Sequence, residues 1–377
     1  MSPYRVSTIA ALGRQVDDLA LLVTGVDVAP GLEGEPVRIG SIPSIRLQHV
    51  RHHPSGYSER YEVHVPVGTL RALRRESSRD VFVVELGLRT ALAVCWRMLD
   101  SDRRLIVHAD LSEATERGRG WLRTVFRKAL IRRTDTVMVN GRSGARYLRS
   151  LGCPEAKIGR LPYASDMPRF GGIPDLPANR PDEDPLRLLY VGRLAEVKGL
   201  VPFVERLAAA VAARPERAVV LTMVGDGEQA AAIDAIALPA NLRIERVGAV
   251  DYDSVPGFYG ECDVVVMPSF GDTWGLCVNE AMAAGRPVLG SIGAQAVEEM
   301  VAEGITGWLF DAADVPSLDS ALGRRLSSTA AQRATLGRQA RATAAVLSPE
   351  RIAMRIVDAF RASRGLRSCA DEATAAS

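Results

Sequence analysis

Short apolar runs alternate with longer amphipathic segments through residues 186–310. The runs expected to form strands are "PLRLLYV", "RAVVLTMV", "NLRIERVG", "VVVMPS" and "PVLGS". The segments with helical spacing are "KGLVPFVERLAAAVAARP", "EQAAAIDAIA" and "LCVNEAMAAG", with a shorter helical turn at "DSVPGFYGECD". Strands that alternate with helices of about 10–15 residues predict a parallel, doubly wound sheet. Ligands of such sheets bind at the carboxyl ends of the strands.

The first half alternates less regularly, but it also predicts α/β layering. Strands are expected within "DLALLVTGVD", "DVFVVELG", "RLIVHADLS" and "DTVMVNG". Helices are expected near residues 5–16, 66–76, 87–99, 119–133 and 141–151. The fold class expected for the whole chain is therefore α/β.

The length of the chain indicates two domains, because 377 residues exceed a single ordinary core. Residues 171–185 contain four prolines and no periodicity, which is typical of a linker. We expect an N-terminal domain over 1–172, a linker over 173–185 and a C-terminal domain over 186–345. A further helix is expected near 349–364, where a Ser-Pro boundary precedes a helical pattern.

Composition indicates a globular chain, with 47% hydrophobic residues, 24% charged residues and a mean hydropathy of +0.03. No uninterrupted apolar run approaches the roughly 20 residues of a membrane-spanning helix, and the N-terminus lacks the pattern of a signal peptide. The five cysteines are scattered and form no CxxC pair, so neither a disulfide framework nor a zinc site is expected. We expect a cytoplasmic protein.

The charge is unevenly distributed along the chain. Residues 1–172 carry 27 Lys/Arg and 18 Asp/Glu, or +9, and the remainder carries 47−27 = 20 against 45−18 = 27, or −7. Within the basic half, residues 117–133 combine arginines at i, i+4 spacing with apolar neighbours. This pattern permits peripheral contact with the inner face of an anionic membrane, although a core-packed helix with a solvated basic face is the preferred interpretation. No nucleic-acid partner is expected.

The turn "YVGRLAEVKGL" is the first candidate binding site. It places Arg193 and Lys198 just after an expected strand, next to Gly192 and Gly199. A glycine turn that leads into a helix offers free backbone N–H groups to an anion. Two cations added there suit a diphosphate, whereas a solvated basic turn is the alternative.

The turn "VGDGEQA", residues 224–230, matches G-x-G-x-x-A between a strand and a helix. This pattern is one mark of dinucleotide binding and leaves open an NAD(P)-binding oxidoreductase. The turn follows the second strand of its domain rather than the first, and Asp226 is poorly suited to a pyrophosphate. A purely structural turn is therefore the preferred interpretation.

Two acids, Asp272 and Glu280, lie eight positions apart in "GDTWGLCVNEAMAAG". Glu280 falls within an expected helix among alanines, and its carboxylate can accept from both hydroxyls of a ribose. Asp272 precedes that helix and can reach a second set of hydroxyls, while Trp274 and Gly275 let the backbone approach a ligand. The alternatives are a helix N-cap for Asp272 and a surface acid for Glu280.

These motifs, together with "GITGWLF", occur in the order found in the family 4 retaining glycosyltransferases of the GT-B fold, which the sequence resembles over most of residues 186–312. The resemblance implies two Rossmann-like domains that face each other across a cleft, with the 349–364 helix crossing back onto the N-terminal domain. It also implies that Arg193 and Lys198 bind the donor diphosphate, that Glu280 binds the ribose and that Asp272 contacts the transferred sugar. The remaining donor-binding positions implied are Gly192, Val247, Thr273, Trp274, Gly275 and Leu276.

The sequence departs from the family pattern at two positions. Asp272 stands where Glu is usual, and Trp274 where Phe is usual. In the first half the resemblance is weaker, but His108 follows a strand where the family often has a histidine near the reacting sugar. The catalytic residues implied are therefore Asp272, His108, Arg193 and Lys198.

The expected function is retaining transfer of a hexose-type sugar from a UDP- or GDP-linked donor to an unidentified acceptor, forming an α-glycosidic bond. The acceptor would belong to glycan, glycolipid or natural-product biosynthesis. No metal or cofactor is expected, because two cations already serve the diphosphate turn and no HxH or DxD cluster lies beside it. An NAD(P)-dependent oxidoreductase and a non-catalytic sugar-nucleotide sensor are the alternatives.

Overall fold

The computed structural model describes residues 3–24, 31–52, 58–181 and 184–375. The chain forms two compact units. Within the described residues, unit 1 comprises 3–24, 31–52, 60–164 and 349–375, and unit 2 comprises 58–59, 165–181 and 184–348. Residues 165–172, which the sequence placed in the N-terminal domain, thus belong to unit 2. The reason is Phe170, which is buried with its ring 5.3 Å from that of Tyr259, a residue of unit 2.

Unit 2 is built on one parallel sheet of six strands in the order β11-β10-β9-β12-β13-β14. Its strands are β9 (Leu186–Val191), β10 (Val219–Val224), β11 (Leu242–Gly248), β12 (Val264–Met267), β13 (Val288–Ser291) and β14 (Gly307–Phe310). The first five correspond to the five strands expected here. The order reverses between β9 and β12, which is the doubly wound arrangement of a Rossmann-like fold.

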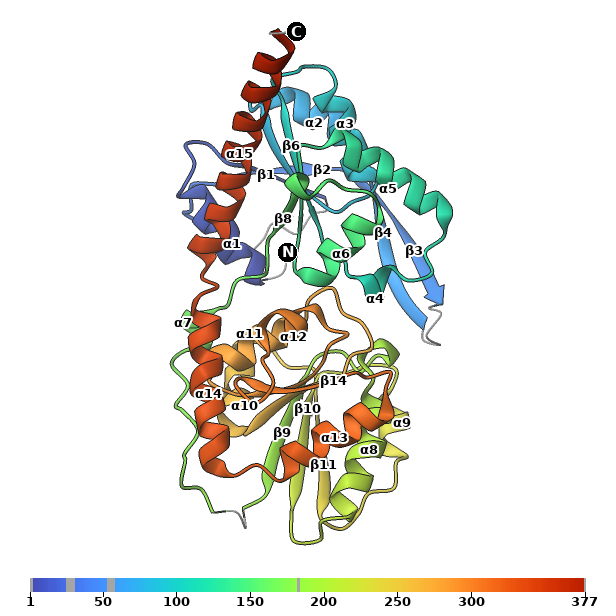
Figure 1. Ribbon diagram of the computed structural model, residues 1–377, viewed down its shortest axis with the longest axis vertical. Coiled ribbons are helices and arrows are strands. Elements are labelled where there is room, and N and C mark those ends of the chain that lie inside the picture. The colour runs from blue at the N-terminus through green and yellow to red at the C-terminus, as the bar shows by residue number, and fades with distance from the viewer. Residues whose placement is uncertain (1–2, 25–30, 53–57, 182–183, 376–377) are drawn as a thin grey trace. The chain divides into compact units, whose positions relative to one another are not determined.

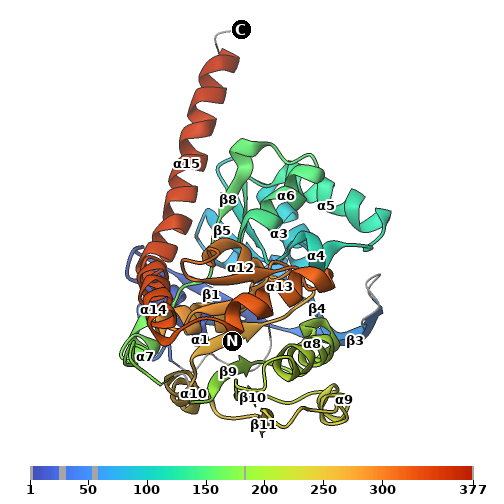
Figure 2. The ribbon, with the colours of Figure 1, turned by 60° about the horizontal axis from the view of Figure 1, so that its bottom comes forward.

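Helices cover both faces of this sheet, as Figures 1 and 2 show. They are α7 (Met167–Phe170), α8 (Leu200–Ala212), α9 (Ala230–Asp234), α10 (Val255–Glu261), α11 (Leu276–Ala283), α12 (Gln295–Met300), α13 (Val315–Leu326) and α14 (Ala330–Ala345), with 3-10 turns η2 (Glu196–Lys198) and η3 (Tyr252–Ser254). Every residue of β12 and β13 is buried, which explains why these strands are continuous apolar runs.

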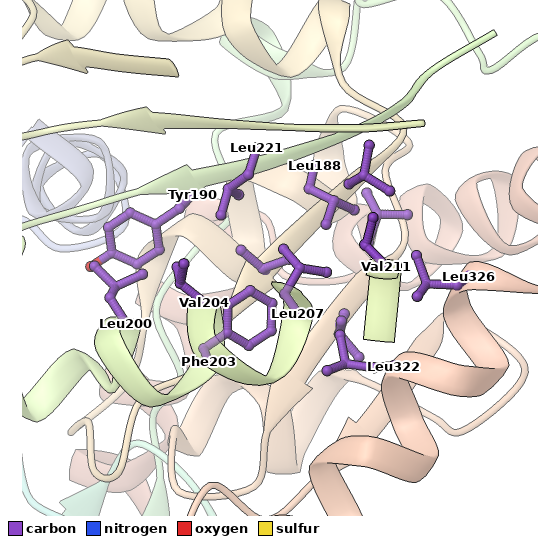
Figure 3. Packing of buried hydrophobic residues seen from close by; sticks show 14 of the residues in the cluster. Leu188, Tyr190, Leu200, Phe203, Val204, Leu207, Val211, Leu221, Leu322 and Leu326 are labelled. Atoms are coloured by element: carbon purple, nitrogen blue, oxygen red, sulfur yellow. The ribbon is translucent and has the colours of Figure 1, made fainter. Parts of the chain in front are cut away.

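One face of the sheet packs against α8 and α13 (Figure 3). Leu188 and Tyr190 of β9 and Leu221 of β10 alternate toward this side, where Phe203 of α8 and Leu322 of α13 meet them. Helix α12 covers the opposite face. Its Val297 side chain lies so close to Gly290 of β13 that an added Cβ would meet it. This two-sided core is what the alternating pattern predicted.

Unit 1 has a parallel sheet in the order β5-β6-β7-β8, made of β5 (Asp80–Val84), β6 (Arg104–Ala109), β7 (Thr136–Val139) and β8 (Ile158–Arg160). Its other strands are β1 (Ala20–Thr24), β2 (Arg38–Ile42), β3 (Ser44–His52) and β4 (Ser58–Pro66), which pair β1 with β2 and β3 with β4. Strands β2, β3, β4 and β8 were not predicted.

The helices of unit 1 are α1 (Pro3–Gly13), α2 (Thr69–Arg75), α3 (Leu88–Arg97), α4 (Glu113–Glu116), α5 (Trp121–Arg133), α6 (Arg142–Ser150) and α15 (Pro349–Ala375), with a 3-10 turn η1 (Glu155–Lys157). All five helices expected in the first half are present. The helix expected near 349–364 is the first part of α15, which lies along α1 (Figure 1). None of the helices in the described ranges is both long and apolar enough to cross a membrane.

Candidate active site

The candidate residues of unit 2 gather where its sheet reverses direction. Strand β9 lies beside β10 on one side and β12 on the other. The chain leaves β9 through Gly192 and Arg193, and it leaves β12 toward Asp272. Because neighbouring parallel strands end at the same edge, the two motifs that are far apart in the sequence meet there.

Lys198 and Asp272 contact each other directly. The Lys198 ammonium donates to Oδ2 of Asp272, and both side chains are about four-fifths buried. Burial lowers the pKa of Lys198, but the Asp272 carboxylate outweighs it, so the pKa is raised and the lysine stays charged. The sequence assigned these residues to different parts of a donor, whereas the structure makes them one ion pair.

Backbone contacts fix the loop that carries Asp272. Its Oδ1 accepts from the Trp274 N–H at 3.2 Å, and its own N–H donates to the Gly293 carbonyl at 3.1 Å. The side-chain amide of Gln295 donates to the Thr273 carbonyl at 2.7 Å. The carboxylate of Asp272 therefore turns back on its own loop, as an N-cap does, while its other oxygen holds Lys198.

Gly275 is the N-cap of helix α11 and has φ at +105°. Residues other than glycine rarely adopt this backbone conformation. A Cβ there would also lie 2.8 Å from Met267. The buried Trp274 indole, just before it, donates to Asn279 Oδ1 at 2.7 Å, and Asn279 donates to the Ser165 hydroxyl at 3.1 Å. Thr273, Trp274 and Gly275 are thus held rigidly against α11, which starts at Leu276.

Glu280 is buried within α11, contrary to the alternative of a surface acid. The Tyr259 hydroxyl donates to its Oε2 at 2.7 Å, and the Tyr252 hydroxyl donates to its Oε1 at 3.3 Å. Burial raises the pKa of Glu280, and the two hydroxyl donors only partly offset this. The hydrogen-bond partners of this carboxylate are therefore two phenols.

The two tyrosines were not identified from the sequence. They lie in "DYDSVPGFYGECD", 28 and 21 residues before Glu280, and only the fold brings them together. The Arg169 guanidinium stacks on the Tyr252 ring at 4.6 Å and pairs with Asp253 at 2.5 Å. Only Tyr259 lies within the helical turn expected at "DSVPGFYGECD", and no local pattern marked either tyrosine as a partner of Glu280.

The turn with Gly192 and Arg193 is fixed by contacts of its backbone. The Tyr190 hydroxyl donates to the Arg193 carbonyl at 2.7 Å, and the Gly192 N–H donates to the Val224 carbonyl at 2.9 Å. Val247, the other predicted donor contact, lies near the end of the neighbouring edge strand β11 and is exposed. All the predicted donor-binding residues therefore lie at or near the carboxyl ends of strands in unit 2.

Both glycines of the "GDG" turn pack against the β9 turn. A Cβ on Gly225 would lie 2.1 Å from the Gly192 carbonyl oxygen, and one on Gly227 would lie 2.5 Å from that of Leu194. The Leu194 N–H donates to the Asp226 carbonyl at 2.9 Å. These glycines let two turns touch, which is the structural interpretation preferred from the sequence, and the oxidoreductase alternative has no support.

His108 lies in unit 1 at the end of β6, in a buried polar network. Its Nε2 is 2.6 Å from Asn140 Oδ1, and Asn140 Nδ2 donates to Asp110. The Tyr163 hydroxyl donates to Asp110 at 2.7 Å, and Arg5 pairs with the same carboxylate at 3.1 Å. Because Asp110 accepts from the Asn140 amide, the Asn140 oxygen faces His108, so His108 carries its proton on Nε2.

Burial lowers the pKa of His108, outweighing the nearby Asp110 carboxylate. The imidazole is therefore neutral at pH 7. Of this network only His108 was identified from the sequence, although "HAD" and "VNG" both follow apolar strands. Within the described ranges of the chain, no group of three His, Cys, Asp or Glu side chains is placed to hold a metal ion.

Part of unit 2 matches a known protein family. Residues 185–328 match the family of glycosyl transferases group 1. The amylovoran biosynthesis glycosyltransferase AmsK of Erwinia amylovora is 26% identical over 268 residues, which cover 67% of this chain and 63% of AmsK. The glycogen synthase of Mycobacterium tuberculosis is 32% identical over 241 residues, 60% of this chain and 56% of that enzyme. The chain thus spans less than two thirds of these relatives.

Solved structures extend the likeness to the whole fold. HepE of Anabaena, in complex with UDP-glucose, superposes with a TM-score of 0.68 over 96% of both chains, at 16% identity. This level of identity shows the fold alone, and that fold is GT-B, as the sequence predicted. Residues 185–328 therefore resemble the glycosyl transferases group 1 in sequence and in the geometry of their motifs, and the chain has the GT-B fold.

Proposed function

We propose that the protein is a retaining glycosyltransferase that moves a hexose-type sugar from a UDP- or GDP-linked donor to an acceptor hydroxyl. The product would be an α-glycoside made in glycan, glycolipid or natural-product biosynthesis. The observation that carries the proposal is the ion pair of Lys198 and Asp272 at the point where the unit 2 sheet reverses. The structure of HepE with UDP-glucose supports this class of donor, and the name of AmsK supports glycosyl transfer in polysaccharide biosynthesis.

In this proposal each charged group binds a different part of the donor. Lys198 and Arg193 bind the diphosphate and stabilise the negative charge that develops as it leaves. Glu280 accepts hydrogen bonds from the ribose hydroxyls, and the phenols of Tyr252 and Tyr259 keep its carboxylate oriented. Asp272 orients the hydroxyls of the transferred sugar.

The contact between Lys198 and Asp272 gives the site a defined starting state. A lysine held by a carboxylate is already positioned before the donor arrives, so little side-chain entropy is lost on binding. When a diphosphate binds, the ammonium is shared between phosphate and carboxylate. We propose that this sharing links the position of the diphosphate to that of the sugar held by Asp272.

His108 is assigned to the same reaction by the family resemblance. Its neutral imidazole can line the reacting sugar without adding a positive charge beside a developing oxocarbenium carbon. Asp110 and Asn140 act on it as positioning residues, because they fix its tautomer. His108→Ala should lower kcat and leave the affinity for free UDP or GDP unchanged, whereas unchanged kcat would remove His108 from the mechanism.

The decisive experiment is a panel of nucleotide sugars tested for slow hydrolysis without acceptor. One or a few UDP- or GDP-sugars should be hydrolysed, and Lys198→Ala should abolish this activity. The anomer released, followed by NMR before mutarotation, should be α from an α-linked donor. A β product would contradict the retaining mechanism, and hydrolysis of none of the donors would contradict the proposed activity.

A further inference from the structure

Helix α5 exposes an apolar face to solvent. Trp121, Leu122, Val125 and Phe126 are exposed by 72%, 67%, 56% and 41%. They occupy positions i, i+1, i+4 and i+5, so they share one side of the helix. The preferred interpretation from the sequence, a helix with its apolar side in the core, is therefore wrong for the first two turns of α5.

Three arginines, one just before α5 and two within it, contact unit 1. Arg119, Arg123 and Arg127, which the sequence suggested as a solvated basic face, converge on the single carboxylate of Glu116 at 3.5, 3.4 and 2.5 Å. Arg127 and Glu116 are both buried, and Arg127 also donates to the Tyr147 hydroxyl at 2.8 Å. The start of α5 is thus held to unit 1 by charges, whereas Leu130 and Ile131 in its last turn are buried in the core of unit 1. The apolar side chains of its first two turns are left in solvent.

Positive charge surrounds the apolar face. Residues 117–133 contain seven Lys or Arg and no Asp or Glu. Arg117 lies exposed before the helix, and Arg132 and Arg133 are exposed in its last turn. Glu116 balances only one of the three cations that contact it. Figures 1 and 2 both show the start of α5 at the outer edge of unit 1.

We propose that α5 is a membrane-docking helix that rests on an anionic lipid bilayer. Its four apolar side chains enter the interfacial region, with Trp121 at the depth where indoles are favoured. The flanking arginines contact lipid phosphates. Self-association through this face would bring two surfaces of the same positive sign together, and that repulsion favours an anionic partner. The inference goes beyond the proposed transfer reaction and does not depend on it.

Trp121 provides a direct optical test. Of the four tryptophans in the sequence, Trp96, Trp274 and Trp308 are buried, and Trp121 is exposed. Titration with phosphatidylglycerol vesicles should shift the tryptophan emission to shorter wavelength as Trp121 leaves water. Trp121→Phe should bind with similar affinity in a sedimentation assay and show no shift. Binding without any change in Trp121 emission would place the contact elsewhere and overturn the proposal.

A pair of valine variants controls for surface hydrophobicity. Val125 of α5 and Val315 of α13 are exposed by 56% and 51%, and both lie on helices. Val125→Glu should weaken vesicle binding by about tenfold or more, because it loses apolar area and adds a negative charge. Val315→Glu should leave binding unchanged. Equal effects of the two changes would show that the surface acts only through its overall charge and would contradict the proposal.

Lipid charge and salt test the role of the arginines. The protein should bind phosphatidylglycerol vesicles but not phosphatidylcholine vesicles. About 1 M NaCl, at which the Debye length falls to about 3 Å, should release it. Arg132→Gln combined with Arg133→Gln should weaken binding by about tenfold or more. Equal binding to both lipids, or a concentration-dependent dimer abolished by Val125→Glu with no vesicle binding, would overturn the proposal. Circular dichroism melts and UDP affinity should be unchanged in all these variants.

Discussion

At the scale of single residues, Glu280 is a proposed binding group whose buried environment disfavours its charged form. Burial raises the pKa of Glu280 in the folded protein above its ordinary value of 4.5. The protonated carboxyl therefore contributes to the free energy of unfolding below pH 4.5, and this contribution is lost as the pH rises through the folded-state pKa. At pH 7 the carboxylate therefore lowers the free energy of unfolding. A binding residue with such a cost is a common compromise between stability and function.

Glu280→Gln should separate these two effects. The amide keeps the shape and removes the buried charge, so thermal melts at pH 7 should show a higher Tm than the parent protein, and the difference should shrink below pH 4.5. Calorimetry should show affinity for UDP or GDP reduced by about 10- to 150-fold, because a charge-assisted hydrogen bond is lost. A lower Tm together with unchanged affinity would contradict both the burial argument and the ribose assignment.

Asp272→Asn tests the ion pair with Lys198. The change removes the carboxylate that competes with a diphosphate for the ammonium, so the affinity for free UDP or GDP should stay the same or increase. The sugar loses its partner, so kcat should fall by about tenfold or more. Asp272→Glu, which restores the usual family residue, should retain measurable activity. Normal turnover in Asp272→Asn would remove the assigned role and leave the family assignment intact.

Arg193 and Lys198 also underlie the expectation that transfer needs no metal. Two cations at the diphosphate supply the charge that Mg²⁺ provides in other phosphate sites. Hydrolysis of the preferred donor should therefore survive dialysis against EDTA with its rate unchanged. A strict requirement for added Mg²⁺ or Mn²⁺ would show that the two side chains are insufficient.

At the scale of elements, the turns after β9 and β10 act as one unit. Gly227→Ala would place a Cβ 2.5 Å from the Leu194 oxygen, a backbone atom that cannot move aside cheaply. We expect a loss of about 1–3 kcal/mol in the free energy of unfolding. Donor affinity should also fall, because the displaced turn carries Arg193.

Gly257→Ala is the matched control for that change. Gly257 lies in α10, and an added Cβ would meet nothing within 4 Å. Alanine is favoured over glycine within helices by about 1 kcal/mol, so chemical denaturation should show equal or greater stability. Similar destabilisation by both substitutions would indicate that the contact with Leu194 is unimportant.

Most elements of unit 2 were predictable, because buried parallel strands are continuous apolar runs that turns interrupt. Helices α13 and α14 were missed, since alanine and arginine obscure their apolar spacing. The signal for α14 was present as a capping box, in which Thr329 accepts from the Gln332 N–H at 3.2 Å and Gln332 accepts from the Thr329 N–H at 3.0 Å. Strand β4 alternates apolar and polar residues in "YEVHV", which was also a readable pattern.

The candidate site was predictable only in its motif residues. Asp272, Glu280, Arg193 and Lys198 stand in recognisable local patterns, and the sheet topology implied that they would meet. The direct contact of Lys198 with Asp272 was not predictable, because it depends on side-chain geometry across 74 positions of sequence. The exposure of the apolar side of α5 was not predicted, because it also depends on side-chain contacts outside the helix. Arg123 and Arg127 of α5 turn toward Glu116, which precedes the helix.

At the scale of the whole molecule, the two units have separate cores. The core of unit 2 joins β9, β10 and β12 with α8 and α13, whereas that of unit 1 joins β5, β6 and β7 with α3, α5 and α6. All the residues proposed to bind the nucleotide belong to unit 2. A ligand that binds only a folded unit stabilises that unit by mass action, by about 2.7 kcal/mol at a concentration of 100 Kd.

Differential scanning calorimetry with UDP or GDP should therefore raise the unfolding temperature of unit 2 selectively. The transition of unit 2 can be identified with Gly227→Ala, which should lower it alone because the substitution lies in a turn of that unit. Saturating nucleotide should move this transition upward and leave that of unit 1 in place. In Lys198→Ala the upward shift should shrink, since the diphosphate loses a charged partner. A nucleotide-dependent shift confined to the transition of unit 1 would show that the nucleotide is bound by other residues, and the donor site in unit 2 would have to be abandoned.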